Sequence, residues 1–101
     1  MKYYDENKEK ELAYKWERQL RKREEARTYV FNYLSSHPCV DCGEPNPVVL
    51  TFDHVRGDKK LGVSEMVGRG WSIETIKAEV RKCDVVCFNC HMKREKRRRT
   101  D

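Results

Sequence analysis

A chain of 101 residues has room for one small domain, and with 39% charged and 38% hydrophobic residues it can bury only a thin core. No stretch is apolar enough or long enough to cross a membrane and no apolar leader is apparent, so we expect a soluble cytoplasmic protein rather than a secreted or membrane-bound one. The net charge of +5 is concentrated in the last eleven residues, which favours a polyanionic partner, although a merely solvated tail is the alternative.

The first predicted element is one long charged helix over residues 5–35, which contain no glycine or proline and are rich in good helix formers. Its apolar residues Leu12, Trp16 and Leu20 recur at i+4 spacing, and such a stripe is usually a packing surface. Pro38 disfavours helix in the residue before it and should end the element. At about 45 Å, the helix is too long to bury its whole stripe on so small a domain, so its first half should project, pair with another chain or lie along DNA.

Two C-x-x-C pairs, Cys39–Cys42 and Cys87–Cys90, enclose most of the remaining chain. In a reducing compartment this pattern is typical of zinc sites rather than of disulfides, and four thiolates suit one tetrahedral Zn²⁺. The free energy of metal binding would then help to fold a domain with a thin core. The fifth cysteine, Cys83, is expected on a packed face as a small apolar group.

Local composition predicts the elements between and after these pairs. In chain order they are a strand at 48–52 that runs into Asp53-His54, a loop at 56–60, a short helical turn at 64–67, a helix from the cap Ser72 to about Lys82, a strand at 84–86, and a final helix that starts within the second pair and continues into the basic tail.

Three residues are candidates for a catalytic site that cuts nucleic acid. The Asp53 carboxylate and the His91 imidazole could hold a divalent cation, and His54 is the natural general base for an attacking water. Neighbouring strand residues point to opposite faces, so Asp53 and His54 share one site only if the strand bends or ends there, which Gly57 makes plausible. Cys90 and His91 lie about 100° apart on a helix, so one can face the zinc while the other faces the groove.

Other roles stay open for these residues. His91 could replace a cysteine as a zinc ligand, and Cys83 could replace Cys87, although C-x-x-C is the better spacing. Taken alone, His54 would be an ordinary surface histidine and Asp53 a turn former.

Basic side chains flank the candidate catalytic residues on both sides. We expect them to contact DNA phosphates, which positions the protein without reading sequence and makes binding weaken with salt. These residues are Arg56, Lys59, Lys60, Lys93, Arg94, Lys96, Arg97 and Arg98.

The order C-x-x-C-G, then Leu50-Thr51-Phe52-Asp53-His54-Val55, then Lys82-Cys83-Asp84-Val85-Val86-Cys87-Phe88-Asn89-Cys90-His91 resembles the zinc-containing HNH endonuclease family. It is especially similar to small HNH proteins of bacteriophages and bacteria, over roughly residues 37–94.

The resemblance implies an α+β fold with a small ββα-metal (HNH, or His-Me finger) core. It further implies a structural Zn²⁺ on the four paired cysteines and a catalytic Mg²⁺ or other divalent cation. The implied activity is metal-dependent hydrolysis of DNA phosphodiester bonds, by nicking or double-strand cleavage, in a bacterial or phage-infected cell. His54 would be the general base, and Asp53 and His91 the ligands of the catalytic cation.

One position departs from the family pattern. Lys82 stands five positions before Cys87, where the family usually has asparagine, and neither Asp84 nor Asn89 matches that place. The departure keeps open a catalytically weak or inactive zinc-stabilised DNA-binding module, with a protein-only adaptor as a third alternative.

We divide the chain into the charged helix 1–36 and a zinc-bound HNH domain with a basic tail over 37–101. The helix could pair with a second copy or with a phage or bacterial protein.

Overall fold

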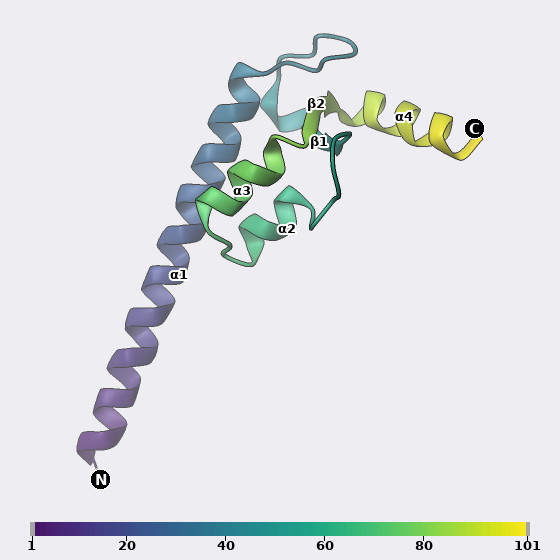
Figure 1. Cartoon of the computed structure of the whole chain (residues 1–101). Coiled ribbons are helices and arrows are strands. Elements are labelled where there is room, and N and C mark those ends of the chain that lie inside the picture. Colours follow the sequence, from purple (N-terminus) through teal and green to yellow (C-terminus); the bar gives the residue numbers. More distant parts are fainter. Residues whose placement is uncertain (1, 101) are drawn as a thin grey trace.

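The computed structural model describes residues 2–100, with side chains from residue 8 onward, as an α+β body from which two helices extend (Figure 1). In chain order the elements are α1 (Lys2–Ser36), the 3₁₀ helix η1 (Pro47–Val49), β1 (Leu50–His54), α2 (Val63–Gly68), α3 (Ile73–Val80), β2 (Cys83–Cys87) and α4 (Phe88–Thr100). The principal extents are 64 × 27 × 20 Å, so the molecule is elongated. No helix within the described residues has the length and apolarity needed to span a bilayer.

The long helix α1 is confirmed, but only its second half packs on the body. Ala26 is buried against α2 and α3, and Tyr29, Val30 and Tyr33 continue this contact. Residues 8–22 are exposed throughout, and in Figure 1 the N-terminal part of α1 extends beyond the other elements. Trp16 is 57% exposed, in agreement with the expectation that so long a helix cannot bury its whole stripe on this domain.

The sheet consists of β1 and β2 in antiparallel pairing, with Leu50 opposite Cys87 and His54 opposite Cys83. The first strand begins two residues later than predicted, because residues 47–49 form a 3₁₀ turn instead. Asn46 caps this turn by accepting a 3.0 Å hydrogen bond from the Val48 N–H. An apolar, β-branched pair was therefore overridden by the local side-chain cap before it.

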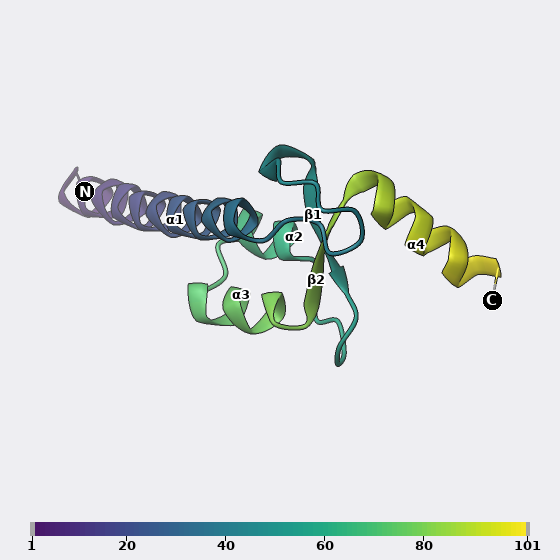
Figure 2. The ribbon, with the colours of Figure 1, turned by 90° about the horizontal axis from the view of Figure 1, so that it is seen from above.

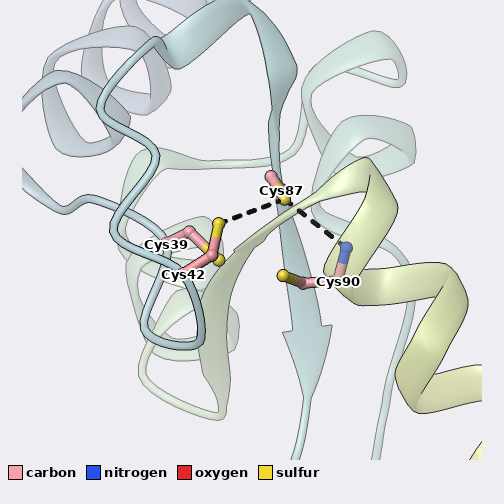
Figure 3. A group of neighbouring side chains, drawn as sticks. All are labelled: Cys39, Cys42, Cys87 and Cys90. Atoms are coloured by element: carbon pink, nitrogen blue, oxygen red, sulfur yellow. Dashed lines mark hydrogen bonds between the residues drawn. The ribbon is translucent and has the colours of Figure 1, made fainter.

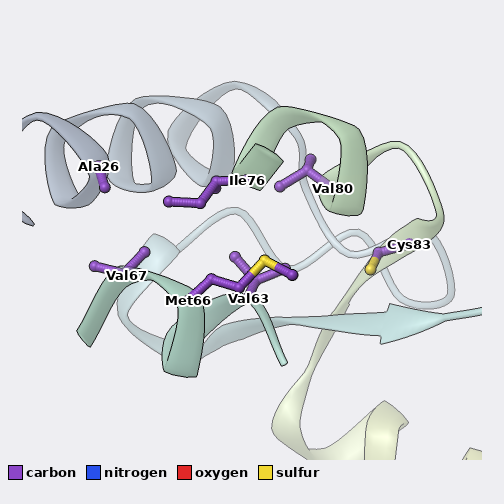
Figure 4. Close-up of a cluster of buried hydrophobic side chains, with 7 residues drawn as sticks. All are labelled: Ala26, Val63, Met66, Val67, Ile76, Val80 and Cys83. Atoms are coloured by element: carbon purple, nitrogen blue, oxygen red, sulfur yellow. The ribbon is translucent and has the colours of Figure 1, made fainter. Parts of the chain in front are cut away.

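Helices α2 and α3 form the first core cluster with one face of α1. Figure 4 shows this cluster, in which Cys83 is buried as expected. Ser72 caps α3 by accepting from the Thr75 N–H at 3.3 Å. The helix ends at Val80, two residues earlier than predicted, and the chain then turns into β2. The buried members of this core cluster are Ala26, Val63, Met66, Val67, Ile76, Val80 and Cys83.

The second core cluster lies at the other end of the sheet and includes Leu34, Leu50, Val85 and Val86 together with three of the paired cysteines. Helix α4 begins where β2 ends and buries only Cys90. Figures 1 and 2 both show α1 and α4 leaving the body in different directions. With so little apolar burial, α4 must be held by other interactions.

Candidate metal centre and candidate catalytic site

The four paired cysteines come together from three elements, as Figure 3 shows. Cys39 and Cys42 lie in the loop after α1, Cys87 ends β2, and Cys90 lies in the first turn of α4. Their sulfur atoms all lie within 4.8 Å of one another, and the Sγ atoms of Cys42 and Cys87 are 3.7 Å apart. Four sulfurs at about 2.3 Å from a tetrahedral zinc would be separated by about 3.8 Å. The cluster therefore fits a metal ion such as zinc.

Backbone hydrogen bonds shape the first cysteine pair. The Gly43 N–H donates to the Cys39 carbonyl at 2.8 Å, and Gly43 has a φ of +83°, which favours glycine. The Cys39 N–H donates to the Glu44 carbonyl at 3.0 Å, and the Val40 N–H to the Val85 carbonyl at 2.9 Å. The loop is thus attached to β2 through its own backbone.

The sulfur atoms influence one another's ionisation. Burial opposes ionisation of Cys39, but hydrogen bonds from the backbone of Cys87, Cys42 and Asp41 lower its pKa to about 6. The Cys87 thiol, followed by burial, raises the pKa of Cys90 to about 12. Neighbouring thiolates repel, and a divalent cation is the natural compensation for that repulsion.

A second group of potential ligands, Asp53, His91 and Glu95, lies where β1 meets α4. One donor atom from each residue lies within 4.8 Å of the others. His91 Nε2 is 3.8 Å from Asp53 Oδ1 and 3.8 Å from Glu95 Oε1. The sequence motif brought Asp53 and His91 together correctly. It missed Glu95, although the i+4 spacing from His91 on a helix was a usable signal.

Two arginines of α4 already bind the Asp53 carboxylate, which is 3% exposed. Arg98 donates to Oδ1 and Oδ2 at 2.8 Å each, and Arg94 donates to Oδ2 at 2.8 Å. Burial alone would raise the pKa of Asp53, but these guanidinium groups lower it below its ordinary value. Asp53 is therefore a carboxylate ready to bind cationic groups.

Arg94 also links α4 to the first cysteine pair and to β2. It makes two 2.7 Å hydrogen bonds to Asp41, from Nε and Nη2, and a 3.3 Å contact to Asp84. Together with Asp53, these carboxylates raise the pKa of the Arg94 guanidinium above its ordinary value, with Asp41 the largest contributor. This network supplies the attachment that the polar surface of α4 cannot provide by apolar burial.

His54 faces a different element from Asp53. Its Nε2 lies 2.9 Å from Oε2 of Glu79 on α3, whereas Asp53 contacts α4. The strand neither bends nor ends before His54, which is still paired with Cys83, so the two side chains alternate as in a regular strand. Asp53 and His54 therefore do not converge on one group of ligands.

Glu79 is a functional candidate for which no sequence signal was available. It is 2% exposed, and its carboxylate also accepts from the Lys60 N–H and from Lys82 Nζ, each at 2.9 Å. Burial opposes its ionisation, but the bonds from Lys82, Lys60 and His54 lower its pKa to about 2. A carboxylate at this position favours the His54 tautomer that carries the proton on Nε2 and leaves Nδ1 as an acceptor.

Lys82 organises the loop that follows His54. Besides Glu79, its Nζ donates to the Asp58 carbonyl at 2.8 Å, and its own carbonyl accepts from the Val55 and Arg56 N–H groups at 2.9 and 3.0 Å. The residue that departs from the family pattern is thus a structural link between this loop and α3.

The basic residues expected on DNA fall into two sets. Arg56, Arg94 and Arg98 are engaged within the protein; Arg56, for example, pairs with Asp84 at 3.0 Å. Lys60 Nζ lies 5.9 Å from the centre of the Trp71 ring. The exposed Lys59, Lys93, Lys96 and Arg97 have no acidic partner among residues 8–100, and the structure leaves them available to a partner.

Comparison with known proteins finds no matching family model, no matching curated protein and no matching solved structure. The family resemblance therefore rests on the motifs described above, and the activity it implies is taken up below as a proposal.

Proposed function

We propose that the chain is a zinc-stabilised, metal-dependent DNA endonuclease of the HNH type. The observation that carries the proposal is the group of Asp53, His91 and Glu95, in which a buried carboxylate meets an imidazole 3.8 Å away at the junction of β1 and α4. Carboxylate and imidazole donors suit a divalent cation of the kind that phosphodiester hydrolysis uses.

In this proposal the three side chains bind the cation and present it to a backbone phosphate. A divalent cation held there would neutralise charge on the phosphate and stabilise the leaving oxygen. Arg98 is 47% exposed and lies near the end of α4, so it can leave Asp53 for a phosphate oxygen when DNA arrives. Asp53 then becomes available as a ligand.

His54 is proposed as the general base. Glu79 accepts a hydrogen bond from the Nε2–H of His54, so Nδ1 takes the proton of the attacking water while the water oxygen bonds to phosphorus and the bond to the leaving oxygen breaks. His54 is adjacent to Asp53 in the strand but points to the other face. The scissile phosphate must therefore lie at this end of β1, within reach of both faces. The unpaired basic side chains of α4 would position the DNA backbone.

The test is nicking of supercoiled plasmid in Mg²⁺, Mn²⁺ or Ni²⁺, beside a chelated control. We expect cleavage by the parent protein and at least about a hundredfold loss in His54→Ala, the usual contribution of a general base. His37→Ala is the matched control, because the His37 ring stacks on Tyr33 at the end of α1 and its Nδ1 lies 2.7 Å from the Tyr33 carbonyl oxygen. Full activity of His54→Ala at unchanged zinc content would contradict the assigned base.

A second candidate, a DNA-binding module without catalysis, is favoured by the arginines on Asp53. Both carboxylate oxygens accept from Arg98, so the guanidinium groups occupy the place of a cation. This candidate predicts DNA retention in a gel without cutting in any of the three metals. It further predicts that Arg98→Ala does not restore cleavage.

A further inference from the structure

The exposed half of α1 carries an apolar stripe that contacts nothing else among the described residues. Leu12, Trp16 and Leu20 are 57%, 57% and 45% exposed. Leu12 and Leu20 lie about 40° to either side of Trp16 around the helix at 100° per residue. The three side chains therefore form one continuous ridge, of the kind that helix pairs bury.

Charged residues continue this ridge at both ends with opposite signs. Glu9 lies seven residues before Trp16 and Arg23 seven residues after it, each within about 20° of the Trp16 direction. Along the helix the ridge is therefore acidic at its first position, apolar at the next three and basic at the last. These five positions are spaced symmetrically about Trp16. Only a partner running in the opposite direction places unlike charges opposite each other at both ends.

We propose that α1 is a homodimerisation helix, in which two copies pair antiparallel with Trp16 at the two-fold axis. In this register Leu12 of each copy packs against Leu20 of the other, and Glu9 meets Arg23 of the other copy. A parallel pair would instead oppose Glu9 to Glu9 and Arg23 to Arg23, which is unfavourable at both ends.

The shape of the molecule also permits this arrangement. Ala26 of α1 is buried in the core of the body, and in an antiparallel pair centred on Trp16 the two Ala26 positions are about 30 Å apart along the helices. The two bodies therefore lie toward opposite ends of the pair. A parallel pair would place both bodies at the same end.

The first experiment is sedimentation of the full chain at concentrations of about 1 to 100 μM, a range suited to a small interface. We expect a reversible dimer, and Trp16→Ala should raise its dissociation constant at least about tenfold, as truncation of a central aromatic anchor does. The matched control is Tyr14→Ala, since Tyr14 is 59% exposed but points about 160° away from Trp16. A monomer throughout this range, or equal effects of both substitutions, would overturn the proposal.

A charge exchange then tests the direction of pairing. Glu9→Arg alone and Arg23→Glu alone should each weaken the dimer, whereas the variant that carries both should recover the parent affinity. Zinc content and helix content, measured on each variant, confirm that the body is intact. If the single variants dimerise like the parent, the antiparallel arrangement is wrong. None of these readouts depends on nuclease activity.

Discussion

At the scale of single residues, Glu79 shows how a buried charge can serve both the fold and a candidate base. Its carboxylate accepts from His54, from Lys82 and from the Lys60 backbone, which fixes the ring of His54 and the loop beside it. Because burial disfavours the charged form, the low pKa of Glu79 depends on these three donors.

The pH dependence of stability follows from this carboxylate. Folding lowers the pKa of Glu79 from 4.5 to about 2, so its stabilising contribution is present above 4.5 and is lost as the pH falls toward 2. Glu79→Gln lacks that contribution. The free energy of unfolding, measured by urea titration, should therefore differ most between the two proteins near pH 7, and the difference should shrink as the pH falls through this window. A difference that does not change with pH would contradict the ionised state of Glu79.

The sequence identified some site residues and missed others for a physical reason. The paired cysteines, Asp53 and His91 belong to short local motifs. The spacing of the cysteines indicated a metal centre, and the motifs around Asp53 and His91 indicated a second candidate group. Glu79 reaches His54 only because α3 folds back beside the strand end, 25 residues later in the chain. Such a partner leaves no local spacing to detect, and neither do the arginine contacts of Asp53.

At the scale of elements, α4 is held by charge rather than by apolar packing. Arg94 reaches the first cysteine pair through Asp41 and the two strands through Asp53 and Asp84, while Cys90 is the one residue of α4 that is buried among those described. The placement of Cys90 and His91 on α4 therefore depends mainly on the guanidinium groups of Arg94 and Arg98, which both bind Asp53.

Substitution of Arg94 tests this attachment. We expect Arg94→Ala to lower the free energy of unfolding by about 2–3 kcal/mol, between the values for exposed and fully buried pairs. Lys93→Ala is the matched control, because Lys93 is exposed and has no acidic partner among residues 8–100, and it should change stability little. Urea titration of both variants at neutral pH makes the comparison. Equal stabilities would show that α4 is held in another way.

The elements themselves were largely predictable, with errors at their ends. The helices, the two strands and their order agree with the periodicity and composition of the sequence. The start of β1 was placed too early, because the cap from Asn46 to Val48 outweighed the strand preference of two valines. The length of the helix correctly indicated that the ridge on α1 would project from the domain, but helical periodicity does not say which partner covers such a surface.

At the scale of the whole molecule, helix α4 extends from the body on the side opposite the N-terminal part of α1, and its sequence is strongly basic (Figure 1). DNA binding through this helix should be strongly salt dependent. Lys96→Ala combined with Arg97→Ala should reduce the slope of log binding constant against log salt by about 2, or about 1 for each lost phosphate contact. Lys8→Ala combined with Lys10→Ala removes the same charge from α1 and should leave the slope nearly unchanged. Equal slopes for both double variants would contradict the prediction that DNA binds to α4.

The four-cysteine cluster joins the loop after α1, the end of β2 and the start of α4. The placement of His91 and Glu95 on α4 therefore depends on it. Removal of the metal should therefore loosen α4 together with the first cysteine pair. Cys42→Ser should lose the ion, whereas Cys83→Ala should keep it, because burial raises the pKa of Cys83 to about 11 and its sulfur lies in the other core cluster.

The most direct measurement is X-ray absorption at the zinc edge of the purified full chain. The cluster geometry predicts one zinc per chain with four sulfur neighbours at about 2.3 Å. A shell with a nitrogen neighbour at about 2.0–2.1 Å would instead make a histidine such as His91 a zinc ligand, and the proposed second metal group would lose its imidazole. A protein that binds no zinc at all would contradict the proposed metal centre on the four paired cysteines.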